Sequence, residues 1–274
     1  MEGPSLVILN EELMPFIGKK VLKVLGNTNQ PKENLLHSTL KEIETWGKVI
    51  FLIFTPRNKK QDIITKTHFL LFGSYRINEP KENRFPRLEL TFKNGTVYFY
   101  SCSIQFDGQD YYNQVDRKVD LLSPDWDEEH VVDLLKKHQE DYLCDLLLDQ
   151  KIFAGSGNII KNEVLFNIRR HPHTRLSEIR PKDWIQIAWA VRDYCFNFYL
   201  WKKNYELRRH WQVYKKVKCP VCGTKLIKEK TGKMKRRTFY CPVCQDEGKD
   251  LKVLTVFDVL PVKPSRKKEN RIDH

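Results

Sequence analysis

The sequence predicts a mixed α+β fold with a strand-rich N-terminal half, a helical second half and a small cysteine-rich ribbon near the C-terminus. Three patterns support this. Apolar or alternating runs of strand length dominate the first half, and helical periodicity replaces them near Asp116–Pro124. Two C-x-x-C pairs then bracket residues 223–240. We therefore expect four parts, at residues 1–118, 119–212, 213–250 and 251–274.

The composition is that of a globular protein with an affinity for polyanions. Hydrophobic residues make up 41% and charged residues 30% of the 274 residues, which suits two domains with cores of their own. Forty-eight Lys and Arg oppose 35 Asp and Glu, giving a net charge of +13. Such an excess most simply attracts nucleic acid, although a ribosomal or membrane-surface protein shares it.

Cysteine usage and the lack of long apolar runs indicate where the protein resides. No apolar run reaches the length of a membrane span, and Met1–Pro4 lacks the basic start of a secretion signal. Cys102, Cys144 and Cys195 are widely spaced in apolar or mixed surroundings, so we expect buried, reduced thiols. We therefore predict an intracellular, cytoplasmic protein without a membrane partner.

The first half is expected to begin with a helix and to continue as strands. The helix covers residues 6–13, after the capping pair Pro4-Ser5 and before Pro15. The turn Lys93–Thr96 joins two later strands as a hairpin, and the whole half is typical of a β-sandwich. The expected strands lie at residues 21–24, 49–54, 63–77, 88–92 and 97–100.

The second half is expected to be helical. Asp125–Glu129 places acidic residues in the first turn of a helix, where negative charge is favourable. Beyond Cys244, residues 251–262 look like a strand and residues 264–274 like a mobile tail. Further helices are expected at residues 141–149, 158–167 and 181–199. Four tryptophans of this half are expected in the core, namely Trp184, Trp189, Trp201 and Trp211.

The four cysteines of the two C-x-x-C pairs have the spacing of a zinc ribbon, because each pair offers two sulfurs from one turn to a tetrahedral ion. We expect one structural Zn²⁺ at Cys219, Cys222, Cys241 and Cys244. The alternative is two reduced or disulfide-linked pairs in a small lobe. The arm between the pairs is basic, with Glu229 as its acidic neighbour, and is expected to contact a phosphate backbone. Its basic residues are Lys228, Lys230, Lys233, Lys235, Arg236 and Arg237.

A glycine-containing loop at residues 150–158 lies between two expected helices. Gly155 and Gly157 allow a tight turn and a close approach of the backbone to a ligand. The helix that follows offers free N–H groups to a phosphate, and Asn158 adds a side-chain amide. The alternative is that these glycines merely separate two helices.

These residues resemble a known family. The run LLDQKIFAGSGNI at 147–159, then NEVLF at 162–166 and His171-Pro172, resembles the helix-two-turn-helix segment of the formamidopyrimidine-DNA glycosylase and endonuclease VIII family. The opening Glu2-Gly3-Pro4 is similar to the endonuclease VIII branch. The resemblance extends from residue 1 to about 245. Other similar segments are DLLSPD at 120–125, WGK at 46–48, residues 68–76 and RRTFYCPVCQ at 236–245.

The resemblance implies a bifunctional DNA glycosylase and abasic-site lyase of base excision repair. Its members bind double-stranded DNA with oxidised bases or abasic sites in the cleft between two domains, and a monomer is expected. The N-terminal amine attacks C1′ of the damaged nucleotide, and the neighbouring glutamate, here Glu2, handles protons. Lys48 is expected to contact a phosphate and help catalysis. Asn158 and Arg236 are expected to hold the flanking phosphates, with Arg237 as the adjacent possibility.

The family also fills the space of the everted base with side chains from two loops. The first loop corresponds to Leu71. The second corresponds to Gln105 or Phe106, and the sequence leaves that choice open. His68, His171 and His173 are expected to be structural rather than metal ligands, because the ribbon already has four sulfurs.

The chain departs from the family pattern at its start. Met1 directly precedes Glu2, where the family usually exposes a proline, and Ser5 replaces a second glutamate. One hypothesis makes the α-amine of Met1 the nucleophile, since an α-amine with a pKa of about 7.7 to 8.0 is far more often neutral than a lysine. The other is impaired lyase activity, or a start that has lost a residue. The rival functions are a non-catalytic protein that binds damaged DNA and a zinc-ribbon protein that binds RNA.

Overall fold

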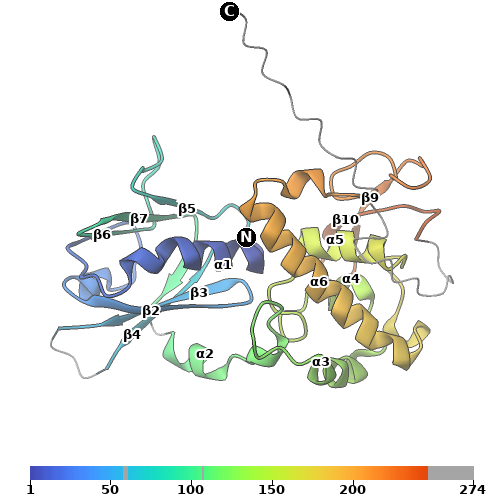
Figure 1. The fold of residues 1–274 in the computed structure, drawn as a ribbon, viewed down its shortest axis with the longest axis horizontal. Coiled ribbons are helices and arrows are strands. Elements are labelled where there is room, and N and C mark those ends of the chain that lie inside the picture. The colour runs from blue at the N-terminus through green and yellow to red at the C-terminus, as the bar shows by residue number, and fades with distance from the viewer. Residues whose placement is uncertain (58–60, 107, 246–274) are drawn as a thin grey trace, which may run out of the picture.

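The computed structural model describes residues 1–57, 61–106 and 108–245 and shows two lobes side by side (Figure 1). Strands form the N-terminal lobe, helices form most of the second, and the N-terminus lies between them. The mixed α+β fold is confirmed. The predicted extension at residues 251–274, with its strand at 251–262, lies outside the described residues, as does the end of the predicted ribbon after Gln245.

Within the described residues, the N-terminal lobe consists of two four-stranded antiparallel sheets. Side chains of both sheets, including Ile50, Leu52 and Phe99, pack into one core, so the predicted β-sandwich is confirmed. One sheet has the order β2 (Thr39–Trp46), β3 (Val49–Thr55), β4 (Ile63–His68) and β8 (Ser103–Gln105). The other has the order β1 (Lys23–Leu25), β6 (Leu88–Phe92), β7 (Gly95–Tyr100) and β5 (Ser74–Ile77).

Helix α1 (Gly3–Leu13) covers this core with Leu6 and Leu9. It starts at Gly3 rather than at Leu6 because Pro4 lies in its first turn, where the fixed φ of proline suits a helix and its missing N–H is not needed. Glu2 is the extended residue before the helix, with φ −101° and ψ 163°. A short 3-10 helix, Met14–Phe16, follows α1.

The structure corrects one strand prediction and adds two strands that the sequence pattern missed. The run at 63–77 is two strands in different sheets, because the chain turns at Gly73, whose N–H donates to the carbonyl of Phe69 (2.8 Å). Strand β2 escapes the sequence pattern because a bulge between Leu40 and Glu42 interrupts its alternation. Strand β8 is three residues long, which is too short for a periodic signal.

Five α-helices are described after β8. The helix predicted at 158–167 is confirmed as α5, and α3 begins after Asp127, whose carboxylate accepts the N–H of His130 (3.0 Å). The helix predicted at 141–149 is one turn, because Asp149 accepts the N–H of Lys151 (2.8 Å) and redirects the chain. The helices are α2 (Gln109–Gln114), α3 (Glu128–Leu135), α4 (Leu143–Leu146), α5 (Asn158–Asn167) and α6 (Trp184–Lys203). Short 3-10 helices lie at Lys32–Leu35, Arg117–Val119, Lys136–His138, Leu176–Glu178, Pro181–Asp183 and Leu207–Arg209.

Helix α5 is buried on nearly every side and uses polar side chains as internal anchors. The carboxylate of Glu163 accepts the backbone N–H groups of Gln212 (2.8 Å), Val213 (3.1 Å) and Tyr214 (2.7 Å). Burial raises the pKa of Glu163 to about 7, although these N–H groups oppose that shift. Because a buried donor without a partner is costly, this carboxylate fixes the segment that leads into the cysteine ribbon.

The ribbon itself is a hairpin of β9 (Ile227–Thr231) and β10 (Arg236–Tyr240). It has a small core in which Phe239 and Cys241 meet Phe166 of α5. The amide oxygen of Asn162 accepts the N–H of Phe239 (2.6 Å), so α5 and β10 are joined by polar as well as apolar contacts. The ribbon therefore packs on the helical lobe and is not an independent finger.

Buried thiols and tryptophans were further predictions. Cys102, Cys144 and Cys195 are buried and free, as expected. Trp184 is buried, but the prediction is wrong for Trp189, which is 51% exposed on the outer face of α6. Trp201 and Trp211 are partly buried. Among the described helices, none has both the length and the apolar character that a membrane crossing requires.

Candidate active site

The candidate site is a cleft of about 930 Å³ between the two lobes. The chain start, the turn after β4, the first turn of α5, the end of α6 and strand β10 all contribute to its walls. The structure thus brings together the predicted residues Met1, Glu2, Lys48, Leu71, Gly157, Asn158 and Arg236. Two predicted residues, Arg237 and Phe106, do not line the cleft.

Glu2 occupies the N-terminal end of α5. Its carboxylate accepts the N–H groups of Ile159 (2.7 Å) and Ile160 (3.3 Å). The prediction that these N–H groups are free for a phosphate is therefore wrong, because a side chain from the start of the chain already uses them. Burial raises the pKa of Glu2, while these hydrogen bonds and the nearby Lys48 favour its charged form.

Glycines allow the chain start to approach α5 closely. A Cβ at Gly157 would overlap Cδ and Cγ of Glu2, and a Cβ at Gly3 would lie 2.7 Å from Cα of Gly155. The N–H of Gly3 also donates to the carbonyl of Gly155 (2.9 Å). The missing side chain of Gly157 therefore leaves space for Glu2, and the predicted contact of Gly157 with DNA stays a prediction.

The α-amine of Met1 lies in the cleft and donates to the carbonyl of Leu70 (3.2 Å). Burial lowers the pKa of this amine below the ordinary value of 8.0. Lys48 and Lys202 shift the pKa in the same direction because a second positive charge disfavours the ammonium form, whereas Glu2 opposes them. The arrangement holds a larger fraction of neutral amine at pH 7 than an exposed N-terminus has.

Lys48 lies with Gly47 in the two-residue turn between β2 and β3, which the helical lobe holds in place. The N–H of Gly47 donates to the carboxylate of Asp120 (2.8 Å), and the indole N–H of Trp46 donates to the carbonyl of Asp116 (2.8 Å). Burial lowers the pKa of Lys48, with Arg236 acting in the same direction and Glu2 against it. Lys48 is therefore a desolvated cation between Glu2 and Arg236.

Asn158 contacts the ribbon in this structure. Its side-chain amide donates to the carbonyl of Arg237 (2.9 Å), so it holds the strand that carries both arginines. Successive side chains of a strand point to opposite faces, and accordingly Arg236 lines the cleft whereas Arg237 does not. Lys161 supports the same strand by donating to the hydroxyl of Thr238 (2.6 Å), and burial lowers its pKa to about 8.

The turn between β4 and β5 carries three consecutive exposed apolar residues beside the amine. Leu70, Leu71 and Phe72 are 52%, 68% and 79% exposed. Phe106, by contrast, packs against the N-terminal core, whereas the exposed Gln105 lines a smaller pocket next to Lys48. Gln105 is thus the more exposed of the two alternatives for the second loop, and Phe72 is an exposed neighbour of Leu71; which side chains fill the space of an everted base stays a prediction.

Three further basic side chains line the cleft and were not predicted as site residues, namely His68, Lys202 and Arg208. His68 accepts the N–H of Leu70 at Nδ1 (3.2 Å), and burial followed by the Met1 amine lowers its pKa. Lys202 lies in the last turn of α6, where a lysine is ordinary, so no local pattern marks it. The Glu11 carboxylate of α1 accepts a hydrogen bond from the Tyr199 hydroxyl and forms an ion pair with Lys203 (2.7 Å). These two contacts fix the C-terminal end of α6 to α1.

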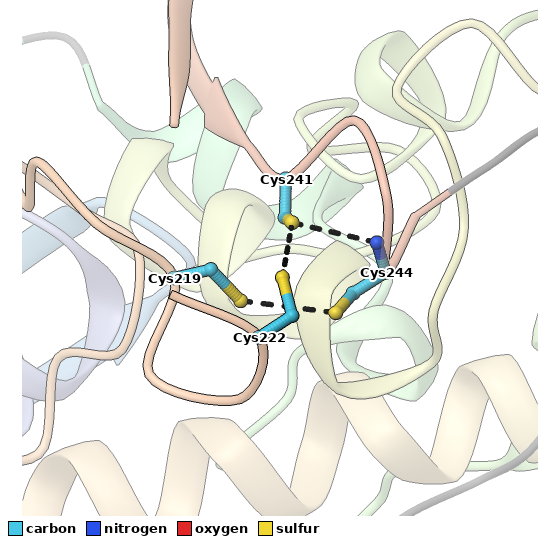
Figure 2. Close-up of side chains that lie close together, drawn as sticks. All are labelled: Cys219, Cys222, Cys241 and Cys244. Carbon is cyan, nitrogen blue, oxygen red and sulfur yellow. Dashed lines mark hydrogen bonds between the residues drawn. The ribbon is translucent and has the colours of Figure 1, made fainter. Parts of the chain in front are cut away.

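The four cysteine sulfurs lie close together, within 4.8 Å of one another (Figure 2). The Cys219 and Cys244 sulfurs are 3.8 Å apart, and those of Cys222 and Cys241 are 3.4 Å apart. A tetrahedral Zn–S distance of about 2.3 Å requires sulfurs about 3.8 Å apart. The donor set and its dimensions therefore fit one metal ion, and His171 and His173 are not part of this group.

Known proteins resemble this chain in sequence and in fold. The formamidopyrimidine-DNA glycosylase H2TH domain matches residues 119–194. Endonuclease 8-like 3 of Mus musculus is 32% identical over 214 residues, which are 75% of this chain and 34% of that protein. Endonuclease 8-like 2 of Bos taurus is 27% identical over 333 residues, covering 91% of this chain and 98% of that protein. This chain belongs to the formamidopyrimidine-DNA glycosylase and endonuclease VIII family.

Solved structures agree with this assignment at the level of the fold. A viral DNA glycosylase has a TM-score of 0.76 at 22% identity and covers 89% of this chain and 100% of its own. Lactococcus lactis formamidopyrimidine-DNA glycosylase, non-covalently bound to DNA with an abasic site, has a TM-score of 0.73 at 23% identity, covering 90% and 100%. The chain spans about a third of the length of the endonuclease 8-like 3 relatives.

Proposed function

We propose that this protein is a bifunctional DNA glycosylase and abasic-site lyase that acts on double-stranded DNA with oxidised bases or abasic sites. One observation carries the proposal: the Met1 amine, the Glu2 carboxylate and the Lys48 ammonium line the same cleft between the lobes. A nucleophile with a lowered pKa beside a carboxyl group with a raised pKa is the pairing that acid–base and nucleophilic catalysis need.

In the proposed reaction, the neutral nitrogen of Met1 forms a bond to C1′ of the damaged nucleotide. The base leaves with the bonding electron pair and takes up a proton. The attacking nitrogen then loses a proton, and its lone pair breaks the C1′–O4′ bond. The electron pair of that bond goes to O4′, which takes up a proton, and a protonated imine joins the Met1 nitrogen to C1′. Loss of a proton from C2′ expels the 3′ phosphate with the C3′–O electron pair, which cuts the strand. Glu2 exchanges the protons, and Lys48 stabilises the negative charge of the phosphate.

DNA binding follows from the charges and the apolar turn of the cleft. Arg236 is placed to hold a phosphate, and Asn158 fixes its strand. Leu71 and Phe72 are placed to enter the base stack, because apolar wedges replace an everted base. We further propose that the protein works as a monomer in the cytoplasm, in association with the nucleoid.

The cysteine ribbon is proposed to hold one Zn²⁺ through Cys219, Cys222, Cys241 and Cys244. The ion supplies folding energy to a lobe with a small apolar core and has no part in the reaction. Its effect on the site is indirect, since β10 carries Arg236.

Borohydride trapping tests the proposed nucleophile. Untagged protein mixed with an abasic duplex and borohydride is expected to give a covalent adduct, which peptide mass spectrometry assigns to the Met1 nitrogen. The same spectrum establishes that Met1 is the first residue. A variant with Gly-Ser placed before Met1 should bind the duplex and form no adduct. An adduct on Lys48, or binding of abasic DNA by the untagged protein without adduct or nicking, would contradict the proposal.

The pH dependence of trapping tests the charges around the amine. Because Lys202 lowers the pKa of the Met1 ammonium, Lys202→Met should raise that pKa. The rising limb of the trapping rate against pH should then move to higher pH, by up to about one unit for a single neighbouring charge. Lys182→Met removes an exposed charge at the other end of α6 and should leave the limb in place. If Lys202→Met leaves the rising limb of the trapping rate at the same pH, the charge of Lys202 does not lower the pKa of the Met1 amine.

Metal content tests the ribbon. Cys219→Ser should reduce bound zinc from one equivalent to well below one and expose the ribbon to proteolysis, because binding of the ion is part of its folding energy. Cys102→Ala, which changes a buried thiol of the other lobe, should retain one equivalent. Full zinc content in the Cys219→Ser protein, measured by atomic absorption, would refute the four-sulfur site.

A further inference from the structure

The tip of the β9–β10 hairpin is the turn that directly precedes Arg236. Arg236 pairs with Thr231 at the end of the hairpin, and residues 232–235 connect them. Gly232 and Lys235 have φ angles of +68° and +47°, and the N–H of Lys235 donates to the carbonyl of Gly232 (3.2 Å). The conformation of this turn therefore sets the direction in which Arg236 leaves the hairpin.

A carboxylate of the helical lobe occupies the turn. Asp145 of α4 accepts the N–H of Lys233 at Oδ2 (2.9 Å) and the N–H of Met234 at Oδ1 (3.3 Å). A Cβ at Gly232 would overlap both carboxylate oxygens, so the turn accepts Asp145 because residue 232 is glycine. Successive backbone N–H groups that converge in this way form an anion-binding nest. Here the anion is the protein's own side chain.

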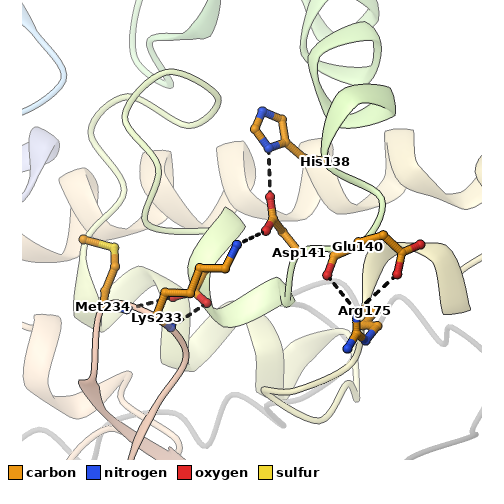
Figure 3. Close-up of polar contacts among 7 residues, drawn as sticks. His138, Glu140, Asp141, Arg175, Lys233 and Met234 are labelled. Atoms are coloured by element: carbon orange, nitrogen blue, oxygen red, sulfur yellow. Dashed lines mark hydrogen bonds and ion pairs between the residues drawn. The ribbon is translucent and has the colours of Figure 1, made fainter.

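A second carboxylate contacts the same tip. Asp141 accepts Lys233 Nζ (2.5 Å) and lies 2.9 Å from Nδ1 of His138, and Figure 3 shows these three residues in a row with Met234 beside them. The Lys233 side chain is exposed, so this ion pair contributes little. The expectation that the arm has Glu229 as its acidic neighbour is thus incomplete, because the tip meets two aspartates of the other lobe.

The hairpin is consequently held on both sides of Arg236. Before Arg236, Asp145 binds the turn through the N–H of Lys233. After Arg236, the carbonyl of Arg237 accepts a hydrogen bond from the side-chain amide of Asn158 (2.9 Å). We infer that Asp145 is a positioning residue for DNA binding, which fixes the hairpin tip so that Arg236 points into the cleft. This inference rests on the proposed function, and it adds a residue far along the chain from every proposed catalytic group.

Because Asp145 is negatively charged, the direction of the change in DNA affinity on its replacement tests the inference. Removal of a negative charge from a DNA-binding protein, taken alone, strengthens its attraction to DNA. If Asp145 positions Arg236, removal of its charge should instead weaken DNA binding. Asp145→Asn should weaken binding to an abasic duplex about fivefold, the scale of one misaligned charged contact. Asp133→Asn makes the same charge change on α3, where Asp133 pairs with Lys136, and should leave affinity equal or slightly higher.

A double-mutant cycle separates positioning from general destabilisation. If Asp145 acts through Arg236, Asp145→Asn should cause little further loss of affinity in an Arg236→Ala background. Gly232→Ala displaces the same carboxylate and also strains the turn at its φ of +68°, so it should weaken binding at least as much as Asp145→Asn. Zinc content should remain at one equivalent in each variant. An equal loss with and without Arg236, unchanged affinity in Asp145→Asn, or loss of zinc together with affinity would each overturn the inference.

Hydrogen exchange keeps this test separate from the proposed function. In the protein without DNA, Asp145→Asn should speed amide exchange at Lys233 and Met234, because both N–H groups lose a charged acceptor. Unchanged exchange there would refute the contact itself. A wild-type protein that protects these amides and yet fails to bind damaged DNA would refute the proposed function and leave the contact standing.

Discussion

The contact between the Glu2 carboxylate and the first turn of α5 is the constraint on which the site depends. It joins residues 2 and 159, and it holds the chain start at the junction of the two lobes. Gly157 and Gly3 make the approach possible, because a side chain at either position would overlap its neighbours. With Glu2 fixed, the α-amine one residue earlier has little freedom, and it meets the carbonyl of Leu70 in the cleft.

The charges of the cleft follow from this placement. Two lysines and the amine share a partly buried region with one carboxylate that is itself engaged by backbone N–H groups. Since burial and like charges both favour the neutral amine, the Met1 nitrogen gains nucleophilic character without a proline ring. Helix α5 also connects the chain start to the ribbon. Its first turn binds Glu2, and its buried polar side chains bind β10.

Much of the fold was predictable because it depends on local patterns. Strands β3, β6 and β7, helix α5 and the four-cysteine group follow from alternation, periodicity and spacing, whereas β2 and β8 do not. The candidate site residues Met1, Glu2, Lys48 and Arg236, which line the cleft, were predicted through family resemblance and not through any local signal. The contacts that assemble them were not predictable. Nothing near Gly157 indicates that its partner is Glu2 rather than phosphate, and nothing near Asp145 indicates a hairpin 88 residues later. Such pairings arise only when distant segments fold together.

The measurement that most directly tests the account is the rate of borohydride trapping by Gly157→Ala on an abasic duplex, read together with affinity. Residue 157 has extended backbone angles (φ −131°, ψ −163°), so alanine changes the space beside Glu2 and not the backbone preference. Displacement of Glu2 should shift the amine and slow adduct formation about 100-fold, as misplacement of a reacting group by about 1 Å does. Duplex affinity, for which Arg236 is the proposed contact, should change far less. Trapping at the wild-type rate would contradict the account.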